Sequence, residues 1–118
     1  MPHLIIDCPE ILFNKVEARQ IMEEVYQAAA STGLFALEGT GGIKVRIRPY
    51  THYFTVGKQD DFIHVFGYIM AGRTSEQKKS LSTKVVSTLN RLFPDVSIIS
   101  MNIQDFDKET YCNKSMIV

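Results

Sequence analysis

The sequence predicts an α+β fold in which two tandem β-α-β units form a four-stranded, mainly β sheet with two helices on one face. Two observations lead to this prediction. Short apolar runs typical of strands alternate with longer segments whose apolar residues recur at helical spacing, and the order strand, helix, strand occurs twice. The chain of 118 residues has the length of a single domain, which we divide into two similar units at about 1–60 and 61–118.

The first unit begins with an apolar strand at residues 2–8, whose centre is the run Leu4, Ile5 and Ile6. A helix is predicted over residues 14–30, with Asn14 as its N-cap and Gly33 as its C-terminal stop. Its apolar face is made of residues at helical spacing, namely Ala18, Met22, Val25 and Ala29. A second strand is predicted at residues 43–48.

The second unit repeats this order. The run FIHVFGYIM at residues 62–70 predicts a strand, and the spacing of Thr74 and Gln77 is that of a capping box at the start of a helix. The apolar stripe of that helix is Leu81, Val85, Leu89 and Leu92. Pro94 ends the helix, and a last strand is predicted at residues 96–103. Because both helices cover one face, apolar residues on the other face favour burial against further copies of the chain.

Composition excludes several classes of function. The net charge is zero, which argues against a nucleic-acid or membrane-surface partner. We find neither a run of transmembrane length nor a signal peptide, and expect a cytoplasmic protein. Cys8 and Cys112 are expected to be free thiols there. His3, His52 and His64 lack the spacing of metal ligands, so no metal site is expected.

Pro2 stands immediately before the first strand, and two interpretations of it are open. Proline has no backbone donor, and the first position of a strand is one of the few sheet positions that tolerates it. Alternatively, removal of Met1 makes Pro2 the amino terminus. It is then a rigid secondary amine, of a class that titrates near neutrality.

Cations gather at two places. On the predicted second strand, three of them alternate with apolar residues and project from one side: Lys44, Arg46 and Arg48. Such a strand is either a solvated sheet edge or an anion-binding surface. Arg73 follows the third strand at the start of a helix, where the helix dipole adds to its field. An arginine there is either a solvated residue or a ligand for an anion.

In their order and spacing, several segments together resemble the tautomerase superfamily, and within it the 5-carboxymethyl-2-hydroxymuconate Δ-isomerase family. These segments are PHLIIDC, TGLF, IKVR, FIHVFGYIMAGR and SMNIQDFDKETYCNK. The resemblance implies a homotrimer with the tautomerase fold. It also implies a cofactor-independent isomerase that moves a proton within unsaturated 2-hydroxymuconate-type di- or tricarboxylates, in the degradation of aromatic compounds.

The resemblance further implies a role for each candidate site residue. Pro2 would be the general base, Arg73 would bind one substrate carboxylate, and either Lys44 or Arg46 would bind another. This agrees with the residues themselves, because nearby cations and partial burial lower the pKa of an amine towards working pH. His3, Tyr50, His52 and Tyr53 are further residues that could line the site, although each is more often a packing residue.

Three other functions are consistent with the sequence. One is a different enzyme of the superfamily, acting on another enol or unsaturated acid. The second is a catalytically silent trimeric binding protein. The third is a structural oligomer that binds no small ligand.

Overall fold

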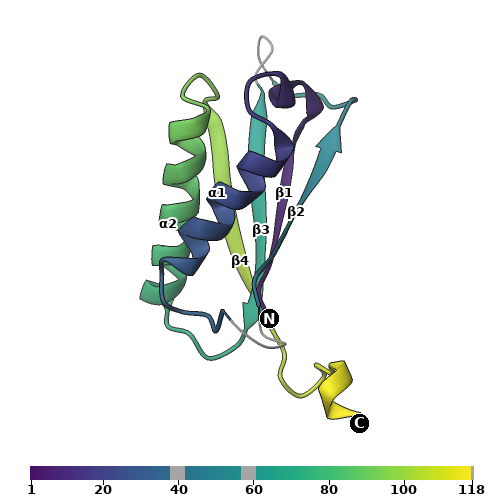
Figure 1. The fold of residues 1–118 in the computed structure, drawn as a ribbon, viewed down its shortest axis with the longest axis vertical. Helices are drawn as coiled ribbons and strands as arrows, with labels where there is room; N and C mark the ends of the chain where they lie inside the picture. The colour runs from purple at the N-terminus through teal and green to yellow at the C-terminus, as the bar shows by residue number, and fades with distance from the viewer. Residues whose placement is uncertain (38–41, 57–60, 118) are drawn as a thin grey trace.

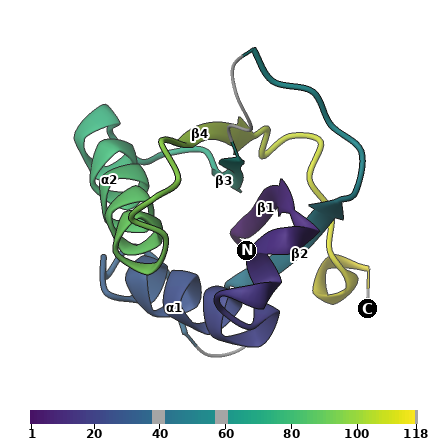
Figure 2. The ribbon, with the colours of Figure 1, turned by 90° about the horizontal axis from the view of Figure 1, so that it is seen from above.

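The structure, a computed structural model, describes residues 1–37, 42–56 and 61–117. Within these residues, a four-stranded sheet carries two α-helices on one face (Figures 1 and 2). The elements are β1 (His3–Pro9), a 3-10 helix η1 (Glu10–Asn14), α1 (Ala18–Ala30), β2 (Lys44–Tyr50), β3 (Phe62–Met70), α2 (Ser75–Leu92), β4 (Ile98–Phe106) and a 3-10 helix η3 (Lys114–Met116). The predicted α+β class is confirmed.

The sheet has the strand order β2-β1-β3-β4. β1 is parallel to β2, β3 is parallel to β4, and the two central strands β1 and β3 are antiparallel. Each parallel pair is therefore joined through one helix, as predicted for two β-α-β units. The boundary expected near residue 60 borders the segment 57–60, which lies outside the described residues.

The core lies between the sheet and the helices. Leu4 and Ile6 of β1 point towards the helices and are fully buried. The predicted stripe of α2 is buried at Leu81, Val85 and Leu89, while Leu92 is half-buried. The capping box is present: the backbone N–H of Gln77 donates to Thr74 Oγ1 at 3.1 Å, and that of Thr74 donates to Gln77 Oε1 at 2.8 Å. α2 ends at Leu92, two residues before Pro94.

The predicted start of the first helix is wrong. Asn14 belongs to η1, and α1 begins only at Ala18, after Glu17, whose side chain makes no capping hydrogen bond. Leu12 explains the delay, because it is buried from within η1 and its carbonyl accepts from the N–H groups of Lys15 and Val16. The chain must leave this turn before the α-helix can begin.

The buried face of α1 also differs from the prediction in part. Val25 and Ala29 are buried as expected, but the third buried residue is Ile21, while Met22 is half-buried. Ile21 is four residues before Val25 and Met22 is three, so helical spacing allows either residue on the buried face. In the structure the core takes up the β-branched Ile21. Gly33 follows the helix with φ 71°, and its N–H donates to the Ala30 carbonyl, as expected for a terminating glycine.

The predicted strands agree closely with the observed ones. β3 has the predicted bounds, and the other three strands end one to three residues later than predicted. The face of the sheet without helices carries side chains of β3 that are half-buried in the single chain: Phe62, His64, Phe66, Tyr68 and Met70. None of the helices among the described residues combines the length and the apolar character that a membrane span requires.

Candidate active site

The strand directions bring three chain segments together at the amino terminus. Because β1 is parallel to β2, His3 pairs with Lys44 at the start of both strands. Because β1 is antiparallel to β3, the same end of the sheet receives the end of β3 and the turn that carries Arg73. Pro2 is buried there, and its carbonyl accepts a hydrogen bond of 2.9 Å from the backbone N–H of Lys44.

Arg73 is held by backbone carbonyls of two different segments. Its Nη2 donates to the Leu34 carbonyl at 2.8 Å, and its Nη1 donates to the Met70 carbonyl at 3.2 Å. The guanidinium carbon also lies 5.0 Å from the centre of the Phe35 ring. A guanidinium has five N–H donors in a planar fork. Two of them fix Arg73 in place, and the rest of the fork can serve an anionic ligand.

Lys44 and Arg46 both leave the edge strand β2 as exposed side chains, as the alternation predicted. The Lys44 ammonium donates to the Gly42 carbonyl at 2.6 Å and lies 4.0 Å from the sulfur of Met1. Arg46 Nη1 lies 3.0 Å from His3 Nδ1 on the neighbouring strand. His3, which the sequence analysis left without a role, is thus in contact with one of the candidate residues.

The electrostatics of this cluster favour neutral bases. The pKa of the Met1 terminal amine is lowered, first by burial and then by the charges of Lys44 and Arg73. The pKa of His3 is lowered first by burial and then by Arg46 and Lys44. Each cation makes protonation of a neighbouring base less favourable. The structure therefore brings Pro2, Lys44 and Arg73 together, with Arg46 beside them through His3.

Arg48, the third cation of β2, is engaged differently. It forms a bidentate ion pair with the buried Asp7, with Nε 2.7 Å from Oδ1 and Nη2 3.1 Å from Oδ2. The Tyr50 hydroxyl donates to the same carboxylate at 3.0 Å. The sequence analysis missed Asp7. No pattern in the sequence indicates it, because the register that sets Asp7 opposite Arg48 is a property of the folded sheet.

Two of the further candidates lie away from Pro2. Tyr50 pairs with Pro9 at the far end of β1, and the Tyr53 hydroxyl donates to Asp61 Oδ1 at 2.9 Å near the start of β3. His52 lies between them in sequence and is exposed. Within one chain, these side chains are at the opposite end of the sheet from the amino terminus.

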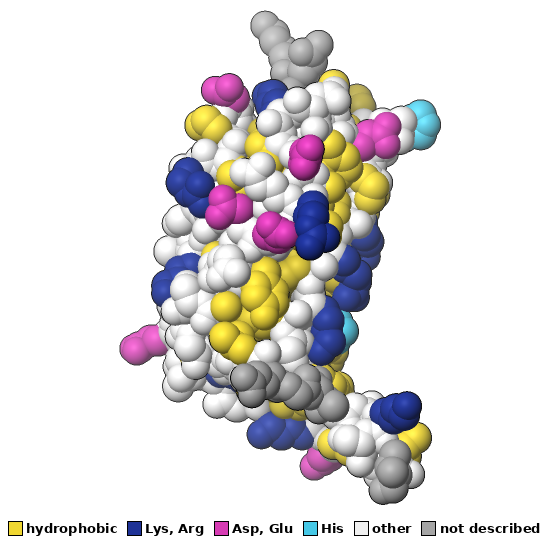
Figure 3. Space-filling model, viewed as in Figure 1, with side chains coloured by type: hydrophobic (Ala, Val, Ile, Leu, Met, Phe, Trp, Pro, Cys, Tyr) yellow, Lys and Arg dark blue, Asp and Glu magenta, His cyan; other side chains and the backbone are white. Residues whose placement is uncertain are grey.

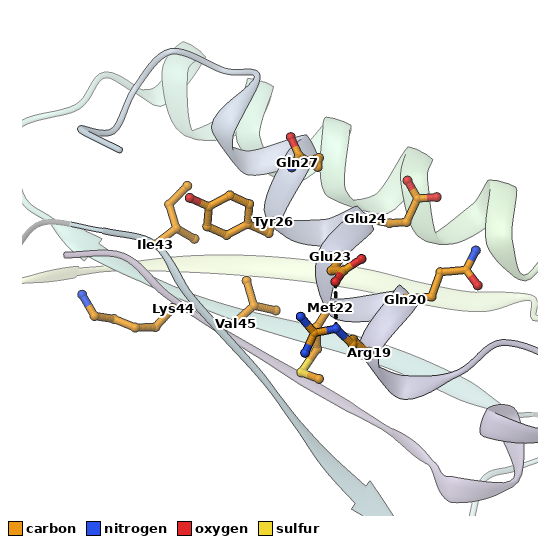
Figure 4. Close-up of a pocket in the computed structure, with 10 residues that line it drawn as sticks. All are labelled: Arg19, Gln20, Met22, Glu23, Glu24, Tyr26, Gln27, Ile43, Lys44 and Val45. Atoms are coloured by element: carbon orange, nitrogen blue, oxygen red, sulfur yellow. Dashed lines mark ion pairs between the residues drawn. The ribbon is translucent and has the colours of Figure 1, made fainter. Parts of the chain in front are cut away.

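A separate groove of about 740 Å³ runs between α1 and β2. Figure 4 shows Tyr26 of α1 facing Ile43 and Val45, with the Arg19–Glu23 ion pair (2.9 Å) at one end and Lys44 at the other. In Figure 3, hydrophobic side chains form a patch in the middle of this face, and Lys and Arg side chains follow its right-hand border. Of the candidate site residues, the described lining includes Lys44 alone, so we place the candidate site at the amino terminus and not in this groove.

The polar groups of the candidate site at the amino terminus are an amine and the side chains of cationic residues. Among residues 1–37, 42–56 and 61–117, no group of three His, Cys, Asp or Glu side chains is arranged to hold a metal ion. What these residues can do is bind carboxylates and move a proton, since a neutral amine close to cations can take a proton from a bound anion.

Comparison with known proteins identifies the family of this chain. The model of the family described as 5-carboxymethyl-2-hydroxymuconate isomerase matches residues 2–118. A comparison with curated proteins finds no match.

Solved structures share the fold. A 5-carboxymethyl-2-hydroxymuconate isomerase from Deinococcus radiodurans R1 superposes with a TM-score of 0.79 at 21% identity, covering 96% of this chain and 88% of that one. A 5-carboxymethyl-2-hydroxymuconate delta-isomerase gives 0.73 at 18% identity, with 97% and 87% covered. A fused 4-OT wild-type symmetric trimer gives 0.76 at 14%, with 95% and 91% covered.

At these identities the structural likeness establishes the fold alone, and the family match carries the assignment. That match extends over nearly the whole chain. The chain belongs to the 5-carboxymethyl-2-hydroxymuconate isomerase family, and it is an isomerase of the tautomerase type.

Proposed function

We propose that this protein isomerises an unsaturated 2-hydroxymuconate-type di- or tricarboxylate, with Pro2 as general base, and that 5-carboxymethyl-2-hydroxymuconate is its substrate. The observation that carries the proposal is the position of the terminal amine, whose pKa is lowered by burial and by the charges of Lys44 and Arg73. Removal of Met1 moves the amine to Pro2, one residue further into the same buried place. Being rigid, the proline ring fixes the direction of its lone pair.

The reaction needs one proton to leave one atom of a conjugated chain and return to another. The neutral Pro2 amine accepts the proton and becomes a secondary ammonium, while the substrate carries the resulting negative charge as a dienolate. The same ammonium then returns the proton to a different carbon, which regenerates the base. Arg73 binds one carboxylate and Arg46 or Lys44 binds another, and the two cations that act on the amine, Lys44 and Arg73, also stabilise the dienolate.

We further propose that the protein acts as a homotrimer. Two exposed apolar side chains after β2 support this, because Phe54 is 93% and Val56 is 96% exposed in the single chain. They lie on the segment that runs outward on the side of the sheet away from the helices (Figure 2). The face of the sheet without helices lies on that side too, and several of the similar structures are described as trimers.

The first test is whether Pro2 becomes the amino terminus and is needed for turnover. Intact mass spectrometry should give a chain shorter by one methionine, and Pro2→Ala should lower kcat by about a hundredfold or more, since a positioned base contributes about 10²–10⁴. Pro94→Ala, which changes an exposed proline after α2, is the matched control and should keep the wild-type rate. Full retention of Met1, or a wild-type rate from Pro2→Ala, would remove the proposal.

The second part of the test shows which cations bind substrate. Arg73→Ala should lower kcat/KM by about ten- to hundredfold, because a hydrogen bond between charged groups contributes about 1.5–3 kcal/mol. Lys44→Ala and Arg46→Ala are compared in the same assay, and the residue that contacts substrate should give a drop of that size. Turnover of another enol acid in place of the muconate would assign the chain a different substrate within the same superfamily.

A further inference from the structure

The contact between His3 and Arg46 joins β1 to the edge strand β2 beside the amino terminus. The two residues are diagonal neighbours, because the register pairs His3 with Lys44 and Ile5 with Arg46. Arg46 Nη1 lies 3.0 Å from His3 Nδ1. A guanidinium carries donors and no acceptor, so His3 Nδ1 is the acceptor and the proton of the neutral ring is on Nε2. This hydrogen bond therefore exists only while His3 is neutral.

The surroundings of His3 keep the ring in that neutral form. Burial lowers its pKa most, followed by the positive charges of Arg46, Lys44 and the chain's amino terminus. From β3, the residue that pairs with His3 is Tyr68, and from β4 the Phe106 ring packs edge-on at 6.0 Å. The ring is thus held on one side by an aromatic contact and on the other by the guanidinium that it orients.

Arg46 also lies farther along β2 than Lys44, the strand cation that acts on the terminal amine. It is two residues beyond Lys44 on β2, which corresponds to about 7 Å along the strand. The cations that act on the amine are Lys44 and Arg73, whereas Arg46 acts on His3. Arg46 is therefore suited to a carboxylate at the far end of a substrate whose near end is bound by Arg73.

We infer that His3 is a positioning residue, which aims the Arg46 guanidinium at the carboxylate farther from the reacting carbon and does so only when its own ring is neutral. The inference rests on the proposed function. An exposed arginine side chain otherwise samples many rotamers, and fixing it in one geometry reduces the entropy lost when substrate binds. Protonation of His3 places a proton on Nδ1, which removes the acceptor and sets two cations against each other.

The test compares two substrates that differ in the far carboxylate, 2-hydroxymuconate with two carboxylates and phenylenolpyruvate with one. His3→Phe should raise KM for the dicarboxylate by about three- to tenfold, the size expected when one long side chain must be ordered on binding. Its kcat, and both constants for the monocarboxylate, should stay near wild type. His3→Asn should restore the dicarboxylate KM, because the amide oxygen can accept from Arg46 in place of Nδ1.

The pH dependence separates positioning from packing. In the wild type, the ratio of the dicarboxylate KM to the monocarboxylate KM should rise as the pH falls below the usual histidine range. In His3→Asn the ratio should stay flat above about pH 5, where an amide does not titrate and the carboxylates of both substrates remain ionised. Titration of the Pro2 amine changes the KM of both substrates alike, so its effect cancels in the ratio. His52→Asn, an exposed histidine at the other end of the sheet, should behave as wild type.

Each contrary result has a defined meaning. An unchanged ratio in His3→Phe would overturn the inference, and so would a ratio that varies above about pH 5 in His3→Asn as strongly as in the wild type. An equal rise in KM for both substrates in His3→Phe would also overturn it, since that would indicate a structural role. If Pro2→Ala keeps full activity, the proposed function fails. If Pro2→Ala is inactive but the ratio of the two KM values is the same in the His3 variants as in the wild type, this inference alone fails.

Discussion

Arg73 should contribute to the stability of the fold independently of any role in binding. In Arg73→Ala, the carbonyls of Leu34 and Met70 lose donors at 2.8 and 3.2 Å, and the Phe35 ring loses the guanidinium 5.0 Å from its centre. Both hydrogen bonds are partly buried, so water replaces them in part. At about 1 kcal/mol for each hydrogen bond and about 0.5–1 kcal/mol for the cation–π contact, the free energy of unfolding should fall by about 2–3 kcal/mol.

Urea unfolding at a fixed protein concentration measures this loss, with an unchanged slope showing that the two states remain comparable. In a thermal melt, the same loss corresponds to about 10 °C for a chain of this size. Arg91→Ala is the matched control. Arg91 pairs with Glu24 on the helix surface at 3.3 Å, and its side chain is 62% exposed, so we expect a loss within about 0.5 kcal/mol.

Equal stability of Arg73→Ala and Arg91→Ala would refute the reasoning, because the two carbonyl contacts would then contribute nothing beyond a surface ion pair. Arg73→Lys should fall between wild type and alanine, since one ammonium cannot replace a planar fork at two carbonyls. Activity of these variants should be measured where each is still folded.

Two further predictions concern assembly and thiol reactivity. Sedimentation equilibrium at micromolar concentration should give the mass of three chains, because the helix-free sheet face and the side chains of Phe54 and Val56 need a partner; a monomer would contradict the proposed trimer. A thiol reagent at neutral pH should modify Cys112 rapidly and Cys8 only on unfolding, since burial, with Asp7 adding to it, raises the Cys8 pKa to about 11 while Cys112 is exposed. Equal rates for both thiols in the native protein would show that Cys8 is accessible.

Local chemistry made much of the fold predictable from the sequence. The strand at 62–70 is a mostly apolar run bounded by polar residues and a turn, which left little freedom in its limits. The capping box at Thr74 and Gln77 needs only residues three apart. The start of α1 depends instead on Leu12 reaching the core from a 3-10 turn, which is a tertiary contact that periodicity does not report.

The positions of the candidate residues on the strands were also predictable in part. Alternation along β2 correctly placed Lys44 and Arg46 on one side of the strand, and the turn after β3 correctly received Arg73. The partners of these cations depend on the register between strands, which a sequence read in one dimension does not contain. The Arg48–Asp7 pair and the His3–Arg46 contact are both cross-strand contacts of this kind.

The two β-α-β units are related by a half-turn about an axis between β1 and β3, because these central strands are antiparallel and each has a parallel partner outside it. When the outer strands are compared position by position from their first residues, the β2 cations correspond to three uncharged residues of β4: Lys44 to Ile98, Arg46 to Ser100 and Arg48 to Asn102. By the same count, Pro2 before β1 corresponds to Asp61 before β3, whose nitrogen is a peptide amide with a delocalised lone pair and is no base. The symmetry of the backbone is therefore broken by charge, because the strand cations of the proposed site have uncharged counterparts in the second unit.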